Sequence, residues 1–320
     1  MKDSGNPPAK TDLAIAGCPD YSTQNVQNSL GRLFDLLGGA EKFFRKGDRV
    51  LIKPNLIVPA GPDCPAQTHP AVITAVASLV KDCSALPMVG DSPAWGNTVA
   101  CLNALGIVDE LKKIGAEITP LNKAVRLKID GSWVKISRSA LDADRIINLP
   151  KLKSHQQLGA TFAVKNMFGC VVGKQKPLWH FARGSDPARF CSLLIEIYKK
   201  LSPSLNIIDA VIAMEGQGPI RGESRHIGAL IASQDPIACE RLCCRLIRLD
   251  PEYLPIIQTA EKIGFGCRSF DQIRILGDDW QKFVCPDFVH ARLTPLRFTL
   301  PGICKSVAKQ ALILFRNFFV

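Results

Sequence analysis

The chain has 320 residues, of which 47% are hydrophobic and 22% charged, and it carries a formal net charge of +11 with a pI near 9.1. This is ample material for one large globular domain or two packed lobes, which excludes a small scaffold that depends on disulfides. The net positive charge permits contact with nucleic acid or an acidic membrane. The excess of basic residues is confined to parts of the chain, however, and suits a small anionic ligand at least as well.

The N-terminal segment MKDSGNPPAKTD is polar and contains two adjacent prolines. It resembles neither a signal peptide nor a membrane anchor. We therefore expect residues 1–10 to be disordered and the protein to be cytoplasmic.

Short apolar runs alternate with amphipathic stretches along the chain. The expected strands cover residues 13–17, 50–53, 88–90, 117–119, 145–149, 206–213 and 227–232. The expected helices cover residues 23–37, 70–81, 98–105, 187–201, 236–249 and 253–263. This alternation predicts an α/β fold with a mainly parallel sheet flanked by helices.

Residues 125–136 alternate polar and apolar side chains around Asp130, Gly131 and Ser132, which predicts a small β-hairpin insertion. Residues 11–285 are expected to form a single α/β domain, with two lobes that divide near residues 137–141 as the alternative. No linker marks such a boundary clearly.

Residues 295–320 predict a basic amphipathic helix that ends in ICKSVAKQALILFRNFFV. Its uninterrupted apolar run is far shorter than the roughly 20 residues that a bilayer span requires. Packing on the core, a dimer contact and contact with a membrane surface all remain open for this helix.

The stretch between Asp144 and Asp186 contains no carboxylate. Its basic residues are Arg145, Lys151, Lys153, Lys165, Lys174, Lys176 and Arg183, joined by His155 and His180. A solvated surface usually mixes both signs of charge, so a stretch with positive charges only indicates a site for an anion.

Lys165 lies in the apolar run ATFAVKNMFGCVV, where an ammonium must reach water or a buried partner. We expect a functional role for Lys165 and an ordinary surface role for Lys174 and Lys176.

Ligands of open α/β sheets bind at the carboxyl ends of the strands, and several polar residues follow the predicted strands. They are Lys53 and Asn55 in VLIKPNL, Asp91 in MVGDSPAWG, Lys151, Lys153 and His155 in RIINLPKLKSH, and Asp209 and Glu215 in LNIIDAVIAMEGQGP. Asp235 is instead expected to cap the helix that begins at Pro236. Together these residues predict a cationic pocket, faced by a few carboxylates, for a phosphate or carboxylate ligand.

The carboxylates Asp91, Asp209 and Glu215 could hold a divalent cation through their oxygen atoms. The alternative is that they pair with lysines, and Lys165 is the expected partner of Asp209.

The glycine-rich segments match neither the dinucleotide fingerprint nor the phosphate-binding loop. The histidines form no paired metal motif, and lysines beside His155 favour a neutral imidazole suited to proton transfer.

Twelve cysteines are many for a cytosolic protein, but none belongs to a CxxC pair. We expect most of them to be small buried apolar residues. Cys239 and Cys243 would share one face of a helix, which is a weak signal for an iron–sulfur or metal site.

Several of these segments also resemble a known family. VLIKPNL, GDSPAWG, INLPKLKSHQQLGATFAVKNMFG, NIIDAVIAMEGQGP and IASQDPIACE are similar, in order and spacing, to segments of the uncharacterised family called domain of unknown function 362. The resemblance spans residues 15–266 and implies a bacterial or archaeal cytosolic protein. Many relatives look to carry a ferredoxin-like segment that binds 4Fe-4S clusters, and this chain has none. Glu240 departs from the aspartate usual at its position, so we leave it out of the expected site.

We expect an enzyme that acts on a phosphorylated or carboxylated small molecule. The expected catalytic residues are His155, Lys165 and Lys153; the expected ligand-binding residues are Lys53, Asn55, Lys151, Asn166 and His180; and the expected metal ligands are Asp91, Asp209 and Glu215. The alternative is an iron–sulfur or electron-transfer accessory protein with a ferredoxin-like partner. Nucleic-acid binding is not expected, because the basic stretch lacks interleaved aromatic residues.

Overall fold

The computed structural model describes residues 10–173, 176, 179, 183 and 185–295. The expected disordered N-terminus and the expected C-terminal helix lie outside these residues, except for their inner ends. His180 and Lys174, both named above, also lie outside them.

A ten-stranded sheet forms the centre of the fold, in the order β12-β1-β11-β10-β7-β2-β3-β4, with β8 pairing β10 and β9. Its strands are β1 (Thr11–Gly17), β2 (Arg49–Pro54), β3 (Leu86–Val89), β4 (Glu117–Ile118), β7 (Arg145–Leu149), β8 (Lys151–His155), β9 (Gly159–Thr161), β10 (Leu205–Gln217), β11 (Arg221–Ser233) and β12 (Ile273–Gly277). Most neighbours are parallel, and the antiparallel pairs of this sheet are β1 with β11, β10 with β11, and β8 with β9. The predicted α/β fold with a mainly parallel sheet is confirmed.

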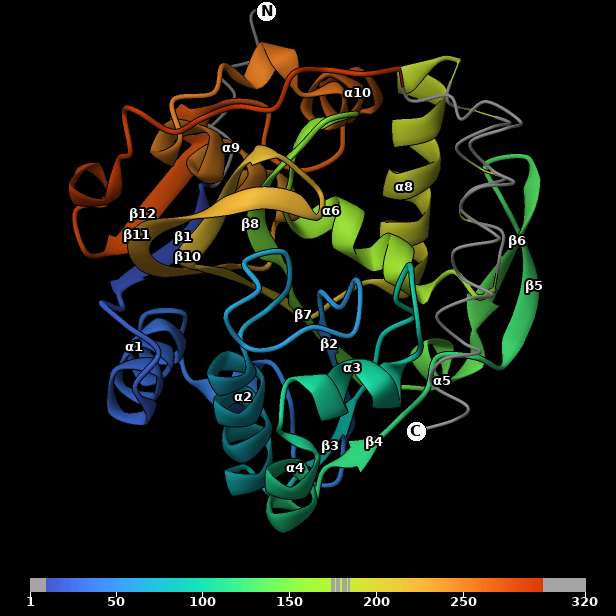
Figure 1. Ribbon diagram of the computed structural model, residues 1–320, viewed down its shortest axis with the longest axis vertical. Coiled ribbons are helices and arrows are strands. Elements are labelled where there is room, and N and C mark those ends of the chain that lie inside the picture. Colours follow the sequence, from blue (N-terminus) through green and yellow to red (C-terminus); the bar gives the residue numbers. More distant parts are fainter. Residues whose placement is uncertain (1–9, 174–175, 177–178, 180–182, 184, 296–320) are drawn as a thin grey trace, which may run out of the picture.

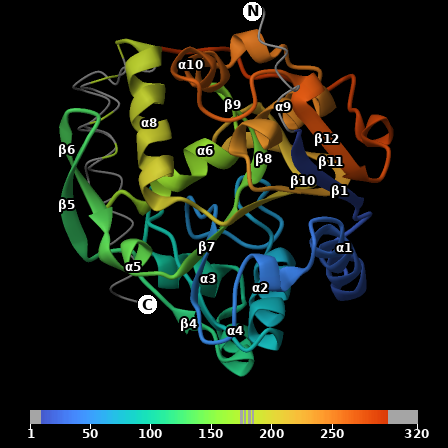
Figure 2. The same cartoon turned by 180° about the vertical axis from the view of Figure 1, so that it is seen from behind.

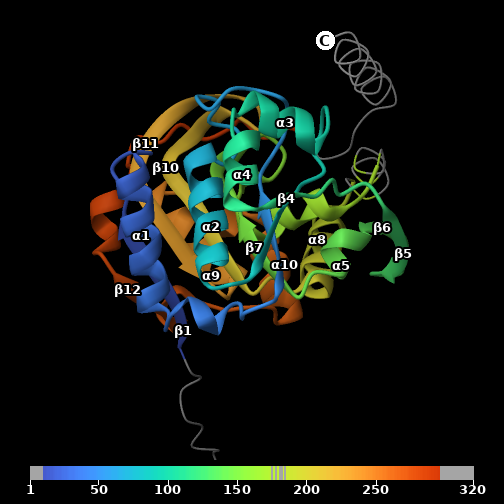
Figure 3. The same cartoon turned by 90° about the horizontal axis from the view of Figure 1, so that it is seen from below.

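Helices cover both faces of this sheet. They are α1 (Thr23–Leu36), α2 (Pro70–Asp82), α3 (Thr98–Ala104), α4 (Val108–Ile114), α5 (Arg138–Leu141), α6 (Ala163–Asn166), α8 (Pro187–Leu201), α9 (Pro236–Leu246) and α10 (Pro255–Ile263). Figure 1 shows α1 to α4 on one side and α6, α8, α9 and α10 on the other, and Figure 3 views the first layer in front of the strands. Each layer buries its own apolar cluster against the sheet.

Local sequence explains where several helices begin. Proline occupies the first turn of α2, α8, α9 and α10, where its missing N–H costs no hydrogen bond. Asp235 accepts hydrogen bonds from the amides of Ile237 and Ala238, so its predicted role as a helix cap is confirmed.

The predicted hairpin is confirmed as β5 (Ala124–Ile129) paired with β6 (Ser132–Ser137). It forms a separate two-stranded sheet and lies beside α8, as Figures 1 and 2 show from opposite sides. Asp130 and Gly131 at its tip both have positive φ, which the two-residue turn of a tight hairpin requires.

The structure extends β10 and β11 well beyond the predicted strands. They cross from the sheet into a long hairpin in which Gln217 pairs with Arg221. The first half of β11 consists mostly of exposed polar residues, and apolar residues begin only at Ile227. The sequence pattern therefore predicted the second half of this strand and missed the first. Pro150 separates β7 from β8, and the long β10 pairs with both.

Among the described residues, no helix combines the length and the apolar content that crossing a bilayer requires.

Candidate functional site

Three adjacent parallel strands, β7, β2 and β3, bring polar residues together at their carboxyl ends. Lys53 lies near the end of β2 and is the parallel neighbour of Asn148 on β7. Asp91 follows β3, which pairs with the other side of β2. The backbone therefore places Lys53, Asn148 and Asp91 at one edge of the sheet, where α/β proteins usually bind ligands.

Lys53 and Asp91 form an ion pair of 2.8 Å between Nζ and Oδ1, with side chains only 0% and 2% exposed. Lys53 Nζ also donates to the carbonyl of Pro54 and to Asn166 Oδ1. The Asp91 carboxylate accepts hydrogen bonds from the amides of Leu56 and Ser92. Both charges are therefore paired and hydrogen-bonded, as buried ions must be.

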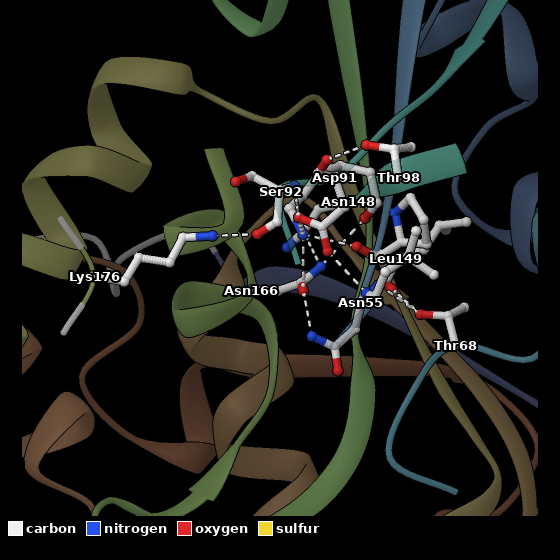
Figure 4. A network of polar contacts seen from close by, with 12 residues as sticks. Asn55, Thr68, Asp91, Ser92, Thr98, Asn148, Leu149, Asn166 and Lys176 are labelled. Atoms are coloured by element: carbon white, nitrogen blue, oxygen red, sulfur yellow. Dashed lines mark hydrogen bonds and ion pairs between the residues drawn. The ribbon is translucent and has the colours of Figure 1, made fainter. Parts of the chain in front are cut away.

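A chain of asparagine side chains connects this ion pair to the interior. Asn55 Nδ2 donates to Asn166 Oδ1, Asn166 Nδ2 donates to Asn148 Oδ1, and Asn148 Nδ2 donates to Asn206 Oδ1. Figure 4 shows Asn55, Asn166 and Asn148 beside Asp91, with the hydrogen bonds between them drawn as dashed lines. Sequence reasoning found Asn55 and Asn166 but missed Asn148 and Asn206, whose only signal is an amide within an apolar strand.

Four lysines lie around this network, and we call Lys53, Lys153, Lys165 and Lys176 the lysine cluster. Lys153 Nζ donates to Asn55 Oδ1 at 2.5 Å and to the carbonyl of Ala66 at 2.6 Å. Lys176 Nζ donates to the carbonyl of Ser92, as Figure 4 shows. Lys176 was expected to be an ordinary surface residue, and this was wrong, because its side chain is half-buried over the Asp91 loop.

Lys165 differs from the other three lysines. Its side chain is half-buried on α6, and it forms no hydrogen bond or ion pair with any described residue. The prediction that it would pair with Asp209 was wrong. Asp209 is instead the parallel neighbour of Lys151 across β10 and β8, and these two side chains pair at 2.9 Å.

Burial and mutual repulsion lower the pKa values of Lys153, Lys165 and Lys176. Burial, followed by the charges of Lys176 and Lys53, lowers the pKa of Lys165 to about 8. Burial also lowers the pKa of Lys176 to about 8, against the attraction of Asp91. The pKa of Lys153 lies well below its usual value because of burial and the neighbouring Lys165. At least part of the cluster can therefore gain or lose protons near neutral pH.

A second polar group surrounds Asp209. Lys151 Nζ donates to Tyr21 Oη at 2.7 Å, and Tyr21 donates to Asp209 Oδ1 at 2.8 Å. The Tyr21 ring stacks on His69 with centroids 3.5 Å apart, and the His69 amide donates to Asp209 Oδ2. Sequence reasoning missed Tyr21 and His69, which lie in loops without a strand or motif to mark them.

The predicted metal ligands are not brought together. Asp91 pairs with Lys53, Asp209 with Lys151, and Glu215 with Arg225 near the outer end of β10. No group of three or more His, Cys, Asp or Glu residues in the described part of the chain is arranged to hold a metal ion.

His155 ends β8 two residues after Lys153, so both side chains lie on the same face of this strand. It is buried, and its Nδ1 accepts a hydrogen bond from the Gln157 amide at 3.1 Å. This hydrogen bond assigns the proton of the neutral ring to Nε2.

Glu240 supports the helix that carries Lys165. Its buried carboxyl accepts a hydrogen bond from the Val164 amide at 3.0 Å, within the first turn of α6. Burial raises the pKa of Glu240 to about 8, although hydrogen bonds from the backbone of Val164 and Ala163 oppose this. Sequence reasoning set Glu240 aside, but the structure places it directly beneath the site.

The cysteines of the described residues are all free, and most are buried, as expected. Cys239 and Cys243 lie in the apolar core, where burial raises both thiol pKa values well above normal. A separate hollow of about 540 Å³ is lined by Cys18, His226, Cys285 and neighbouring residues, away from the lysine cluster.

The comparisons with known proteins agree with the sequence resemblance. The family model described as domain of unknown function (DUF362) matches residues 50–245, which include the whole lysine cluster. A thylakoid-associated protein of Synechocystis sp. is 36% identical over 313 residues, which are 95% of each chain.

Two solved structures are similar to part of this chain. The lactate racemase apoprotein from Thermoanaerobacterium thermosaccharolyticum has a TM-score of 0.46 and 12% identity, over 73% of this chain and 57% of that one. A protein from Thermotoga maritima has a TM-score of 0.42 and 12% identity, over 71% of this chain and 59% of that one. The chain thus spans less than two thirds of either structure.

Proposed function

The chain belongs to the family described as domain of unknown function (DUF362), and we propose that it is an enzyme that binds an anionic small molecule at the lysine cluster. One observation carries this proposal. The four lysines lie close enough to repel one another, Asp91 pairs with Lys53, and Lys165 has no partner among the described residues.

A bound anion would neutralise the excess positive charge of the lysine cluster. Lys53 is satisfied by Asp91, whereas the hydrogen bonds of Lys153 and Lys176 go to neutral oxygens. The positive charge of these three lysines, with Lys165, therefore exceeds what Asp91 can neutralise. A phosphate or carboxylate beside Lys165 would relieve the repulsion and raise the lowered lysine pKa values.

The surrounding residues define the roles that we propose. Lys165 and Lys176 are the half-buried members of the cluster and would contact the ligand first. Asn55 and Asn166 would orient it through the amide chain that already fixes them. Lys153, together with His155 on the same face of β8, would transfer protons.

Calorimetry with inorganic phosphate and a panel of phosphorylated and carboxylated metabolites tests the binding, and native mass spectrometry looks for an anion that co-purifies. Lys165→Gln should weaken the binding about tenfold or more, because hydrogen bonds to a charged group are strong. Lys199→Gln is the matched control, since Lys199 is an exposed lysine of α8 paired with Glu196. Equal affinity in the two variants, or no binding of any anion, would refute the proposal.

A further inference from the structure

The residues on either side of Lys165 are both held by hydrogen bonds. The Val164 amide is bonded to Glu240, and the Asn166 side chain is bonded to Asn148 and to the Lys53 carbonyl. The backbone of Lys165 therefore has little freedom, while its amine has no partner in the described structure. A half-buried amine that has no partner among the described residues, on a backbone held by hydrogen bonds, is suited to act as a nucleophile.

We propose that Lys165 forms an imine with the carbonyl carbon of an anionic aldehyde or ketone whose charged group is bound by the neighbouring lysines. This inference rests on the proposed function, because the anion site supplies the ligand's orientation. It names the substrate class as a phosphorylated or carboxylated carbonyl compound.

The step is balanced without an oxidant or reductant. The neutral amine attacks the carbonyl carbon, so a C–N bond forms as the C–O π bond breaks, and the oxygen takes a proton to give a carbinolamine. Loss of water then leaves a protonated imine. One ammonium and one carbonyl thus give one iminium and one water. The proton released when Lys165 becomes neutral returns to the departing oxygen through a neighbouring lysine or solvent.

The lysines of the cluster have different roles in this step. Lys153 and Lys176 already donate hydrogen bonds, so their nitrogens are fixed and suited to holding an anion or passing a proton. Lys165 can exist as the free amine near neutral pH, because its pKa is lowered to about 8 by burial and by the charges of Lys176 and Lys53.

The test traps the imine by reduction. The full chain is incubated with pyridoxal 5′-phosphate, an anionic aldehyde, and reduced with borohydride, and the modified lysines are mapped by mass spectrometry. Pyridoxal without the phosphate is the matched neutral probe. Lys165 should be the main adduct with the phosphorylated probe. Pyridoxal masks its aldehyde as an internal hemiacetal, so each yield is divided by the yield at the exposed Lys112 with the same probe. This ratio should be about tenfold or more higher with the phosphorylated probe, because the phosphate adds charge-assisted contacts. With the probe at a saturating concentration at every pH, labelling should increase as the pH rises through 8 and Lys165 becomes neutral.

Phosphate binding, measured in parallel, separates the two proposals. Lys165→Arg keeps the charge but cannot form an imine, so it should lose the adduct while it binds phosphate more tightly than Lys165→Gln does. Phosphate binding without an adduct at Lys165, or adducts only on surface lysines such as Lys112, would overturn the imine and leave the anion site standing. No phosphate binding, with equal labelling by both aldehydes, would overturn the proposed function and the anionic substrate class together.

Discussion

Lys53 and Asp91 form their buried ion pair against the backbone of Gly169, which leaves no space for a side chain. A Cβ atom at residue 169 would lie 2.5 Å from Lys53 Cε and 2.6 Å from Lys53 Nζ, and closer still to Asp91 Oδ1. Gly169 is therefore required by close packing. Its φ lies outside the left-handed region, so no unusual conformation is involved.

Gly169→Ala should destabilise the protein by about 2 to 4 kcal/mol, because overpacking would separate a buried ion pair. Urea denaturation measures the change. Gly31→Ala in α1 is the control, since a Cβ there meets nothing within 4 Å and alanine favours the helix. A Gly169→Ala protein as stable as the Gly31→Ala protein would contradict the close packing of the ion pair.

The ion pair itself predicts strong coupling between its two partners. Lys53→Met or Asp91→Asn alone should each cost about 3 to 5 kcal/mol, because each leaves an unpaired buried charge. Asp91→Asn keeps the size of the side chain and an oxygen that can accept from the Leu56 amide. The double variant should cost less than the sum by about 2 kcal/mol, as a double-mutant cycle in urea would show. Additive losses would mean that the two charges do not depend on each other.

The sequence predicts the position of this ion pair better than it predicts the partners of other charges. Strand–helix alternation places Lys53 and Asp91 at the carboxyl ends of two strands. The parallel pairing of β2 and β3 then brings the two side chains together. The partner of Asp209 depends instead on register. Only the pairing of β10 with β8 puts Lys151, and not Lys165, opposite this carboxylate.

Other parts of the site depend on packing between distant segments. Glu240 reaches Val164 because α9 packs against α6, a contact that no local pattern encodes. Glu215 lies apart from the lysines because β10 continues beyond the apolar run that marked it in the sequence. The chemical types of the residues could thus be read from the sequence, whereas their pairing required the three-dimensional structure.

Glu240 should make stability depend on pH. Its pKa is about 8 in the folded protein against 4.5 as the ordinary value, so between these values the native state binds a proton that the unfolded chain has lost. The unfolding free energy should therefore fall as the pH rises from about 4.5 to 8.

Glu240→Gln should remove this dependence, because the amide is neutral and its oxygen can still accept from Val164. The variant should gain on the order of 4 kcal/mol relative to wild type between pH 5 and 8.5. Unfolding in urea at a series of pH values measures this difference. Glu110→Gln on the exposed face of α4 gives the background for a surface substitution. A constant difference between Glu240→Gln and wild type across this range would show that Glu240 ionises normally.

Anion affinity should also depend on pH through the lysine cluster. Lys165 and Lys176 both have pKa values of about 8, so above this pH an anion meets neutral amines and can bind only with uptake of protons. Sulfate is the suitable probe because it remains a dianion throughout the range. Its dissociation constant should rise by about tenfold or more between pH 7 and 9.5, at constant ionic strength.

Arginine substitutions separate the two lysines, because a guanidinium stays charged over this range. Lys165→Arg should flatten the pH dependence in part, and Lys165→Arg with Lys176→Arg should flatten it almost completely. Calorimetry in buffers of different ionisation enthalpy should show proton uptake by wild type and little by the double variant. The same steep profile in both proteins would assign the titration to other groups. A flat profile in wild type would mean that these two ammoniums do not bind the anion.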